Sequence, residues 1–252
     1  MSRIGFLLLV FFLTAFYNVR SQSVRDTNIN IAMFSFHYSF HMPGGDMAER
    51  FGRSNTVGGD FVFKTRSGWL MGLDYSFIFG EKINGIDDYF GAIRNKSGFV
   101  IDGNGMLAET YLYERGFNAA VILGKQFDIW NPNPNSGPFI QIHGGFMQHY
   151  VRIENPYKTA PQVNGEYAKL YDRMTIGFSL TEFVGYRFMG NHRLLNFYAG
   201  FEFIQGFTRG VRSYNADDMS SENPPRRDYL SGLRLGWIIP LYGKTKQEFY
   251  YF

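Results

Sequence analysis

The sequence predicts an all-β chain that folds as an eight-stranded antiparallel up-and-down transmembrane β-barrel. Three observations support this class: segments of alternating hydrophobicity, connections that alternate between long and short, and an aromatic C-terminal residue, Phe252. Short turns at one rim, long loops at the other and an even strand count are what such a barrel requires. We therefore expect short periplasmic turns and long extracellular loops.

The first 21 residues are typical of a secretory signal peptide. Arg3 precedes a nearly unbroken apolar run over residues 4–16, and Val19-Arg20-Ser21 fits a loose small-x-small cleavage rule. A membrane-spanning helix needs about 20 apolar residues, which this run does not provide. We expect a signal peptide over 1–21, cleaved on export, and a single barrel domain over 22–252.

Composition narrows the functional classes. The chain has 25 Lys and Arg residues against 22 Asp and Glu. This balance provides no basic stripe for nucleic acid, so no nucleic-acid partner is expected. The absence of cysteine excludes disulfides and thiolate metal sites. Aromatic residues make up 19% of the chain, yet the mean hydropathy is −0.21. Strands with one apolar and one polar face explain how a chain so rich in aromatic residues can have a slightly polar mean hydropathy.

The first four strands are expected at residues 28–41, 56–65, 69–80 and 111–127. The third is the clearest, because six large apolar residues alternate with small and polar ones: Trp69, Met71, Leu73, Tyr75, Phe77 and Phe79. A slip in alternation near Ala32-Met33 indicates a bulge in the first strand. Pro43-Gly44-Gly45 should open a loop, and Arg66-Ser67-Gly68 supplies the glycine that a tight hairpin needs.

The last four strands are expected at 138–153, 171–188, from about Leu195 to the loop at Thr208, and at 228–242. The run of Asn and Pro over 131–137 is a turn that cannot continue a ladder. Glu182 disturbs the pattern of the sixth strand, and this indicates either a bulge or a buried polar contact. Eight crossings return the chain to the periplasmic side, so the four long loops should face outside.

The apolar strand faces are expected to point outward. A soluble secreted barrel of the lipocalin kind would place them inside. An eight-stranded barrel has room only for packed side chains or one small ligand, and these faces carry too many Phe, Leu and Ile side chains for that space. The opposite faces are rich in Gly, Ser, Thr and Asn, which would fit. The membrane-embedded interpretation is therefore favoured.

The chain resembles the small integral outer-membrane barrels, of the OmpA transmembrane-domain and OmpX kind. The stretches over 196–203 (NFYAGFEF) and 232–242 (GLRLGWIIPLY) are also similar to uncharacterised outer-membrane barrels of the Bacteroidota type. Phe252 resembles the terminal aromatic residue that such barrels use for assembly, although it lies beyond the last strand. The resemblance implies localisation in the outer membrane, in contact with its lipid and lipopolysaccharide.

Nine ionisable residues should face the lumen. Buried charges must be paired, so we expect an internal network of salt bridges and hydrogen bonds. The histidines match no metal motif, so no metal-ligating residue is assigned. No catalytic or cofactor-binding residue is assigned either. The nine residues are His37, Asp60, Lys64, Asp74, His143, His149, Arg187, Glu202 and Arg234.

Three functions remain open. The leading hypothesis is a non-enzymatic accessory subunit of a larger outer-membrane complex, of the secretion or barrel-assembly type. It would bind other envelope proteins through its surface loops, where function concentrates, or through the barrel wall. A lipid-modifying enzyme would need a serine and a histidine in hydrogen-bond reach, and a narrow gated pore would need the inner glycines to thin the lumen. The candidates for the enzyme are Ser35, Ser39, His37 and His149.

Overall fold

The computed structural model describes residues 28–86, 89–190, 195–217, 219 and 224–241. Eight antiparallel strands follow one another around a closed barrel, and β1 pairs with both β2 and β8. The predicted fold class is confirmed. The expected signal peptide and Phe252 lie outside the described residues. The strands are β1 (Ile31–Gly45), β2 (Ser54–Lys64), β3 (Trp69–Gly80), β4 (Tyr111–Gln126), β5 (Gly137–Glu154), β6 (Thr175–Met189), β7 (Asn196–Gly210) and β8 (Pro225–Leu241).

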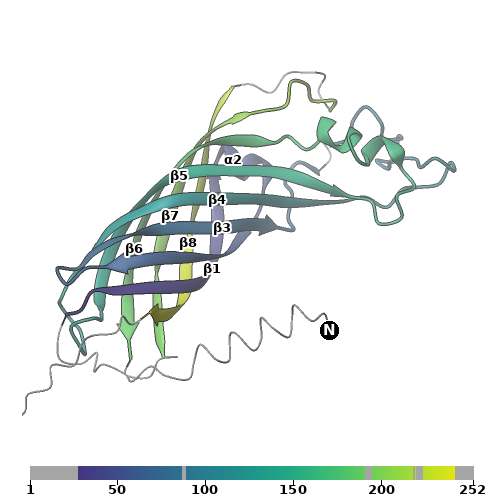
Figure 1. Cartoon of the computed structure of the whole chain (residues 1–252). Helices are drawn as coiled ribbons and strands as arrows, with labels where there is room; N and C mark the ends of the chain where they lie inside the picture. Colours follow the sequence, from purple (N-terminus) through teal and green to yellow (C-terminus); the bar gives the residue numbers. More distant parts are fainter. Residues whose placement is uncertain (1–27, 87–88, 191–194, 218, 220–223, 242–252) are drawn as a thin grey trace, which may run out of the picture.

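The strands are tilted because their pairing is staggered. Stepping from strand to strand through paired residues, from Ser35 on β1, leads around the barrel to Asp228 on β8 and back to β1 at Gly45, ten residues further on. Such a shift is the stagger that closing a sheet into a barrel requires. The tilt is visible in Figure 1.

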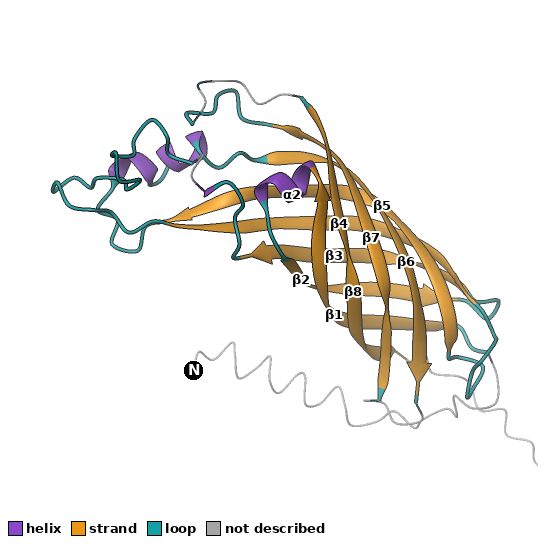
Figure 2. Ribbon diagram, turned by 180° about the vertical axis from the view of Figure 1, so that it is seen from behind, coloured by secondary structure: helices purple, strands orange, loops and turns teal. Residues whose placement is uncertain are grey.

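The two rims differ as predicted. The connections over 65–68 and 127–136 and the one between β6 and β7 lie at one end, and those over 46–53, 81–110 and 155–174 and the one between β7 and β8 lie at the other (Figures 1 and 2). The connection over 46–53 is the exception to the predicted lengths: it is shorter than the turn over 127–136, because β1 continues to Gly45. The described parts of these connections include the α-helix α2 (Asp46–Arg50) and the short 3₁₀ helices η2 (Pro161–Val163) and η3 (Tyr167–Leu170). None of the described helices is long and apolar enough to cross a membrane.

The outer wall is apolar. Leu73 and Val184 leave 61% of their surface exposed, and Phe36 leaves 52%. Tryptophans mark the end with the short turns, where Trp69 and Trp237 are exposed, and Tyr111 lies at the opposite end of the wall. An apolar belt between aromatic girdles is the exterior of a transmembrane barrel. The inner side chains are buried instead, which fits the expected orientation.

Apolar clusters fill both ends of the lumen. One cluster, at the end with the short turns, contains Phe139, Phe183 and Tyr198. The other lies under the long loops and contains Met47 and Phe51. The polar inner face predicted from alternation is therefore incomplete, because several inward positions hold large apolar side chains that pack on one another.

Two details of β1 differ from expectation. The bulge near Ala32-Met33 is wrong, because the register with β2 runs without interruption and Met33 is buried in the lumen. The strand also continues through Pro43-Gly44-Gly45, where a loop was expected. Those residues pair with the start of β8, and this pairing closes the barrel seam.

Glu182 marks neither a bulge nor a buried contact. It pairs in continuous register with Ile142 on β5 and Phe203 on β7, and its side chain is exposed on the outer wall. The pattern changes there because Phe183 turns inward to pack in the lumen. The strand also begins at Thr175 and not at 171, since Arg173 has a left-handed backbone with φ of 46°.

Adjacent glycines on β5 allow a direct test of this packing. A Cβ at Gly145 would lie 2.0 Å from the Ala119 carbonyl oxygen, whereas one at Gly144, on the outer wall, would meet only Phe178 Cζ at 3.9 Å. We expect Gly145→Ala to lower the free energy of unfolding by about 1–3 kcal/mol and Gly144→Ala to leave it unchanged. Urea unfolding in lipid vesicles measures both, and equal stabilities would contradict the described packing.

Candidate functional site

All nine predicted lumen residues are buried inside the barrel. Lys64 and Arg187 lie towards the short turns, His149 lies near the long loops, and the other six lie between these levels. The structure therefore brings most of them into one central cluster. That cluster consists of His37, Asp60, Asp74, His143, Glu202 and Arg234.

One guanidinium holds the central cluster together. Arg234 on β8 donates to Asp74 Oδ2 through Nη1 at 3.0 Å, and its Nη2 lies 2.6 Å from Glu202 Oε2. His37 Nε2 lies 3.1 Å from Asp74 Oδ2, and His41 Nε2 lies 2.7 Å from Glu202 Oε1. The two carboxylates come from β3 and β7, so Arg234 ties separate parts of the barrel wall across the lumen.

Three residues of this cluster could in principle ligate a metal ion. His37, Asp60 and Asp74 offer ligand atoms that lie within 4.8 Å of one another. Sequence spacing did not indicate this group because each residue comes from a different strand. The two carboxylates already have protein donors: Tyr198 Oη donates to Asp60 at 2.8 Å, and Arg234 holds Asp74. The protein's own side chains thus already occupy the two carboxylates that a metal ion would need.

The part of the lumen near the short turns is cationic. Lys64 Nζ donates to the amide oxygens of Asn28 and Asn135, both at 3.1 Å. Arg187 donates to Gln126 Oε1 at 2.9 Å and lies over the Phe139 ring. Neutral amide oxygens and an aromatic face therefore stabilise these two cations.

A second polar cluster lies beneath α2. His149 Nε2 is 2.9 Å from both Asp228 Oδ2 and Thr175 Oγ1, and the edge of the Phe51 ring covers the imidazole. Our list of lumen residues omitted three buried ionisable residues: His41 beside Glu202, Asp228 beside His149, and Glu114, which accepts a hydrogen bond from Ser54 Oγ. All three are buried and continue the inward alternation of their strands, so extending that pattern to the strand ends would have found them.

The residues considered for lipid chemistry do not assemble a nucleophile. His37 faces Asp74 and His149 faces Asp228, which gives two pairs of histidine and carboxylate. Within the described contacts, neither imidazole meets a serine hydroxyl. Ser35 and Ser39 are at most 2% exposed, so a lipid substrate has no access to them.

Aromatic rings fill the space beside two of the inner glycines. A Cβ at Gly236 would lie 2.2 Å from Tyr198 Cε1, and one at Gly200 would lie 2.6 Å from Phe183 Cζ. The aromatic rings therefore occupy the space that these glycines leave. At these two positions the glycines therefore provide no free space for a pore.

The long loops pack together into a cap, whose apolar core includes Phe90, Val163 and Tyr171 and is continuous with the cluster of Met47 and Phe51 at this end of the lumen. Asp217 accepts a hydrogen bond from the Phe90 backbone N–H at 2.6 Å and pairs with Arg173 at 3.1 Å. Arg212 pairs with Asp172, and hydrogen bonding to this carboxylate raises the pKa of Arg212. These contacts join the connections that follow β3, β5 and β7.

Four exposed apolar side chains lie close together in sequence near the tip of the β3–β4 loop. We call Phe99, Ile101, Met106 and Leu107 the loop patch, in which Met106 is 67% and Leu107 is 56% exposed. The tip is a defined turn, because Asp102 accepts backbone hydrogen bonds from Asn104 and Met106, both at 2.8 Å. The bond from Met106 makes the largest contribution to the lowered pKa of Asp102.

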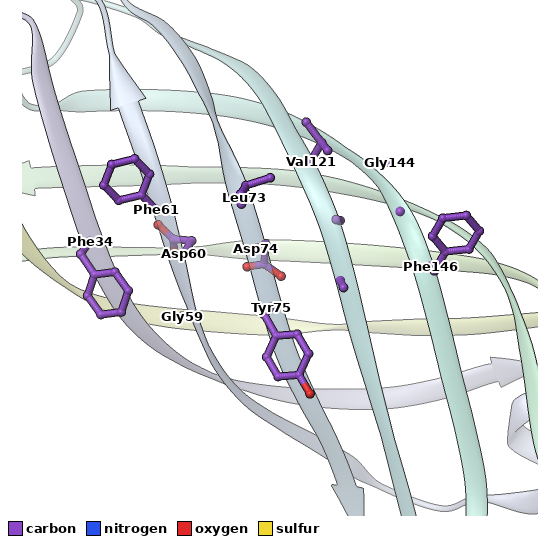
Figure 3. A pocket seen from close by; sticks show the side chains of 13 residues that line it. Phe34, Gly59, Asp60, Phe61, Leu73, Asp74, Tyr75, Val121, Gly144 and Phe146 are labelled. Carbon is purple, nitrogen blue, oxygen red and sulfur yellow. The ribbon is translucent and has the colours of Figure 1, made fainter.

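A shallow hollow of about 500 Å³ lies on the outer wall over β1 to β5 (Figure 3). Small residues at Gly59, Ala119 and Gly144 form its floor, and larger side chains such as Phe61 and Phe146 surround it. The lining is mostly apolar and also includes Asp60 and Asp74, whose carboxylates accept hydrogen bonds from Tyr198 and Arg234 in the lumen. The hollow itself lies within the apolar belt. It is suited to an apolar group in the membrane.

Structural comparison finds barrels of similar extent. Neisserial surface protein A (NspA) is 9% identical with a TM-score of 0.46, and the match covers 83% of this chain and 96% of NspA. Ail, the attachment invasion locus protein of Yersinia pestis, is 5% identical with a TM-score of 0.45, covering 84% and 99%. The N-terminal β-barrel domain of Pseudomonas aeruginosa OprF is 9% identical with a TM-score of 0.36, covering 84% and 98%.

No protein-family model matches the sequence, and no curated protein matches it. The assignment of fold therefore rests on the closed strand order, the outward apolar belt and the buried polar lumen. The chain has the architecture of a small outer-membrane β-barrel.

The central cluster predicts a large effect of Arg234→Ala. Removing the guanidinium leaves Asp74 and Glu202 buried without their shared cation, which should cost about 3–5 kcal/mol of unfolding free energy. Arg209→Ala, at an exposed position on β7, is the matched control and should change stability by less than about 0.5 kcal/mol. Urea unfolding in lipid vesicles gives both values. Similar values for the two variants would show that the cluster adds little stability.

Proposed function

We propose that this chain is a non-enzymatic accessory subunit of a larger outer-membrane complex, of the secretion or barrel-assembly type, and that it binds another envelope protein through the loop patch. The exposed apolar side chains at the tip of the β3–β4 loop carry this proposal. Contiguous exposed apolar groups on a folded surface are characteristic of protein interaction sites. Outer-membrane lipid and lipopolysaccharide would surround the belt below.

The order of the cap supports binding by the loop patch. The Gly103 backbone N–H donates to the Thr159 carbonyl at 2.9 Å, which fastens the tip to the β5–β6 loop. A surface held in place before binding loses less conformational entropy when a partner docks. The filled lumen also argues for a role at the surface, since its ionisable groups are engaged by other side chains of this chain.

Loss of the apolar tip should separate the subunit from its partner. We expect the double variant Met106→Ser, Leu107→Ser to reduce stoichiometric partner recovery by about tenfold or more, because exposed apolar anchors dominate interface energy. The measurement is quantitative mass spectrometry after gentle-detergent extraction of the tagged protein from its native outer membrane.

Trp130→Ser is the control for that experiment. Trp130 is 86% exposed on the β4–β5 turn at the opposite rim, so its loss should leave partner recovery unchanged. Recovery of the barrel alone from the unmodified strain would overturn the proposed function. Full recovery with the double variant would exclude the loop patch as the interface.

A further inference from the structure

The outer wall carries a carboxylate at mid-strand. Glu182 is the central residue of β6, seven residues from each end of the strand. Its cross-strand neighbours are Ile142 and Phe203, and its outward neighbours along β6 are Leu180 and Val184. An ionisable side chain thus lies exposed within the apolar belt.

Such a position is energetically unfavourable in a bilayer. Charged groups on the lipid face of a barrel destabilise it most at the middle of the membrane. Among the described residues, Glu182 has one hydrogen-bond donor: Gln205 Nε2 lies 3.4 Å from Oε1, close to the limit for a hydrogen bond. We call Glu182 and Gln205 the wall pair. Within the described part of the chain, the Glu182 carboxylate therefore has only this one weak hydrogen bond.

The fold keeps Glu182 in this position. Phe183, the next residue, is buried in the lumen against Phe139 and Tyr198, with ring centroids 5.2 and 5.8 Å away. Because side chains alternate along a strand, turning Glu182 inward would expose Phe183 and break this packing. The continuous register of β6 with both neighbouring strands leaves no bulge that could redirect the side chain.

We propose that the wall pair is a docking site for a membrane-embedded segment of a partner protein that brings a hydrogen-bond donor, a lysine, arginine or amide side chain, to Glu182. Polar residues inside a membrane mark functional contacts in general, because an unpaired polar group is costly in hydrocarbon. This inference rests on the proposed function and adds a second contact, on the barrel wall, to the loop patch.

The depth of Glu182 distinguishes a protein segment from lipid. The hydrocarbon core is about 30 Å thick, so headgroup donors lie about half that distance from a group at its centre. Acyl chains themselves offer no donor. A protein segment can present a polar side chain at any depth. The free-energy cost of placing that side chain in hydrocarbon falls when it forms a hydrogen bond with Glu182.

A second copy of this chain is a poorer match. A two-fold contact at the wall pair would bring one Glu182 against the other, and like charges repel in low dielectric. Apart from Gln205, whose amide already lies against Glu182, the outer-wall neighbours of Glu182 on β5, β6 and β7 are apolar, so a copy would bring no cation to this depth. Two copies of this chain would leave both Glu182 carboxylates without a cation. A different chain can supply a hydrogen-bond donor to Glu182.

The hollow on the outer wall lies next to the wall pair. Gly144 on β5 forms part of the floor of the hollow and pairs with Leu180, two residues from Glu182. A bulky apolar side chain of the same partner segment would fit this edge while its donor meets the carboxylate. The surface therefore offers one polar and one apolar contact at neighbouring positions.

Substitution of Glu182 separates the wall contact from stability. We expect Glu182→Leu to reduce recovery of the native complex by tenfold or more, while the purified barrel unfolds at an equal or higher urea concentration, because a cost in lipid has been removed. Glu182→Gln retains an acceptor and should retain more of the complex. Glu154→Leu removes the same group at the extracellular end of β5 and should leave the complex intact.

Cross-linking identifies the occupant. The chain has no cysteine, so Val184→Cys provides a single site for a maleimide-diazirine label, with Val57→Cys on β2 as the control on another part of the exposed wall. After illumination of native outer membranes, we expect position 184 to capture a membrane-spanning peptide that contains a donor side chain. Capture should fall at least tenfold in the Glu182→Leu background and should not occur from position 57.

The outcomes distinguish the two proposals. If position 184 captures only lipid or a second copy, or if Glu182→Leu leaves the complex intact, the docking site on the wall is wrong. The proposed function would still stand if the loop patch variant releases a partner. If neither the loop patch nor the wall yields a partner, both proposals fail.

Discussion

Closure of β1 on β8 is the constraint on which the rest of the molecule depends. A sheet in a bilayer must pair every backbone group, because hydrocarbon offers no hydrogen-bond partner, and only a closed barrel removes the edges. Closure fixes the ten-residue stagger between Ser35 and Gly45. It therefore also decides which side chains face the lumen and at what height they meet. A slip of one residue at any strand would expose the charges and bury the belt.

The lumen solves the electrostatic problem that closure creates. Strand alternation places charged side chains in an interior without bulk solvent, where an unpaired ion is costly. Arg234 pairs with both Asp74 and Glu202. His37 also contacts the Asp74 carboxylate, and His41 contacts the Glu202 carboxylate. Apolar clusters fill the space above and below this group. The ionisable groups are therefore engaged as structural ties, and this supports placing the activity of the protein at its surface.

Two parts of the exterior depart from what a passive barrel needs. The loop patch exposes apolar groups to water, whereas Glu182 exposes a carboxylate to lipid. Each is held in place by packing elsewhere: the cap core orders the loops, and Phe183 in the lumen fixes the direction of Glu182. Both features are unfavourable for the isolated chain and would become favourable in contact with a partner. This shared property links the loop and wall proposals.

The sequence by itself determined the number of strands, the two kinds of rim and the outward direction of the apolar faces. A two-residue period and turn chemistry are local properties, and Trp69 to Phe79 shows them without any tertiary contact. Only the tertiary structure decided that Met33 and Phe183 turn inward, that Arg234 bridges two distant carboxylates, and that His37 meets Asp60 and Asp74. Those outcomes depend on register across strands far apart in the chain and on how closely rings pack against glycines. Neither is encoded in the hydrophobicity of any one segment.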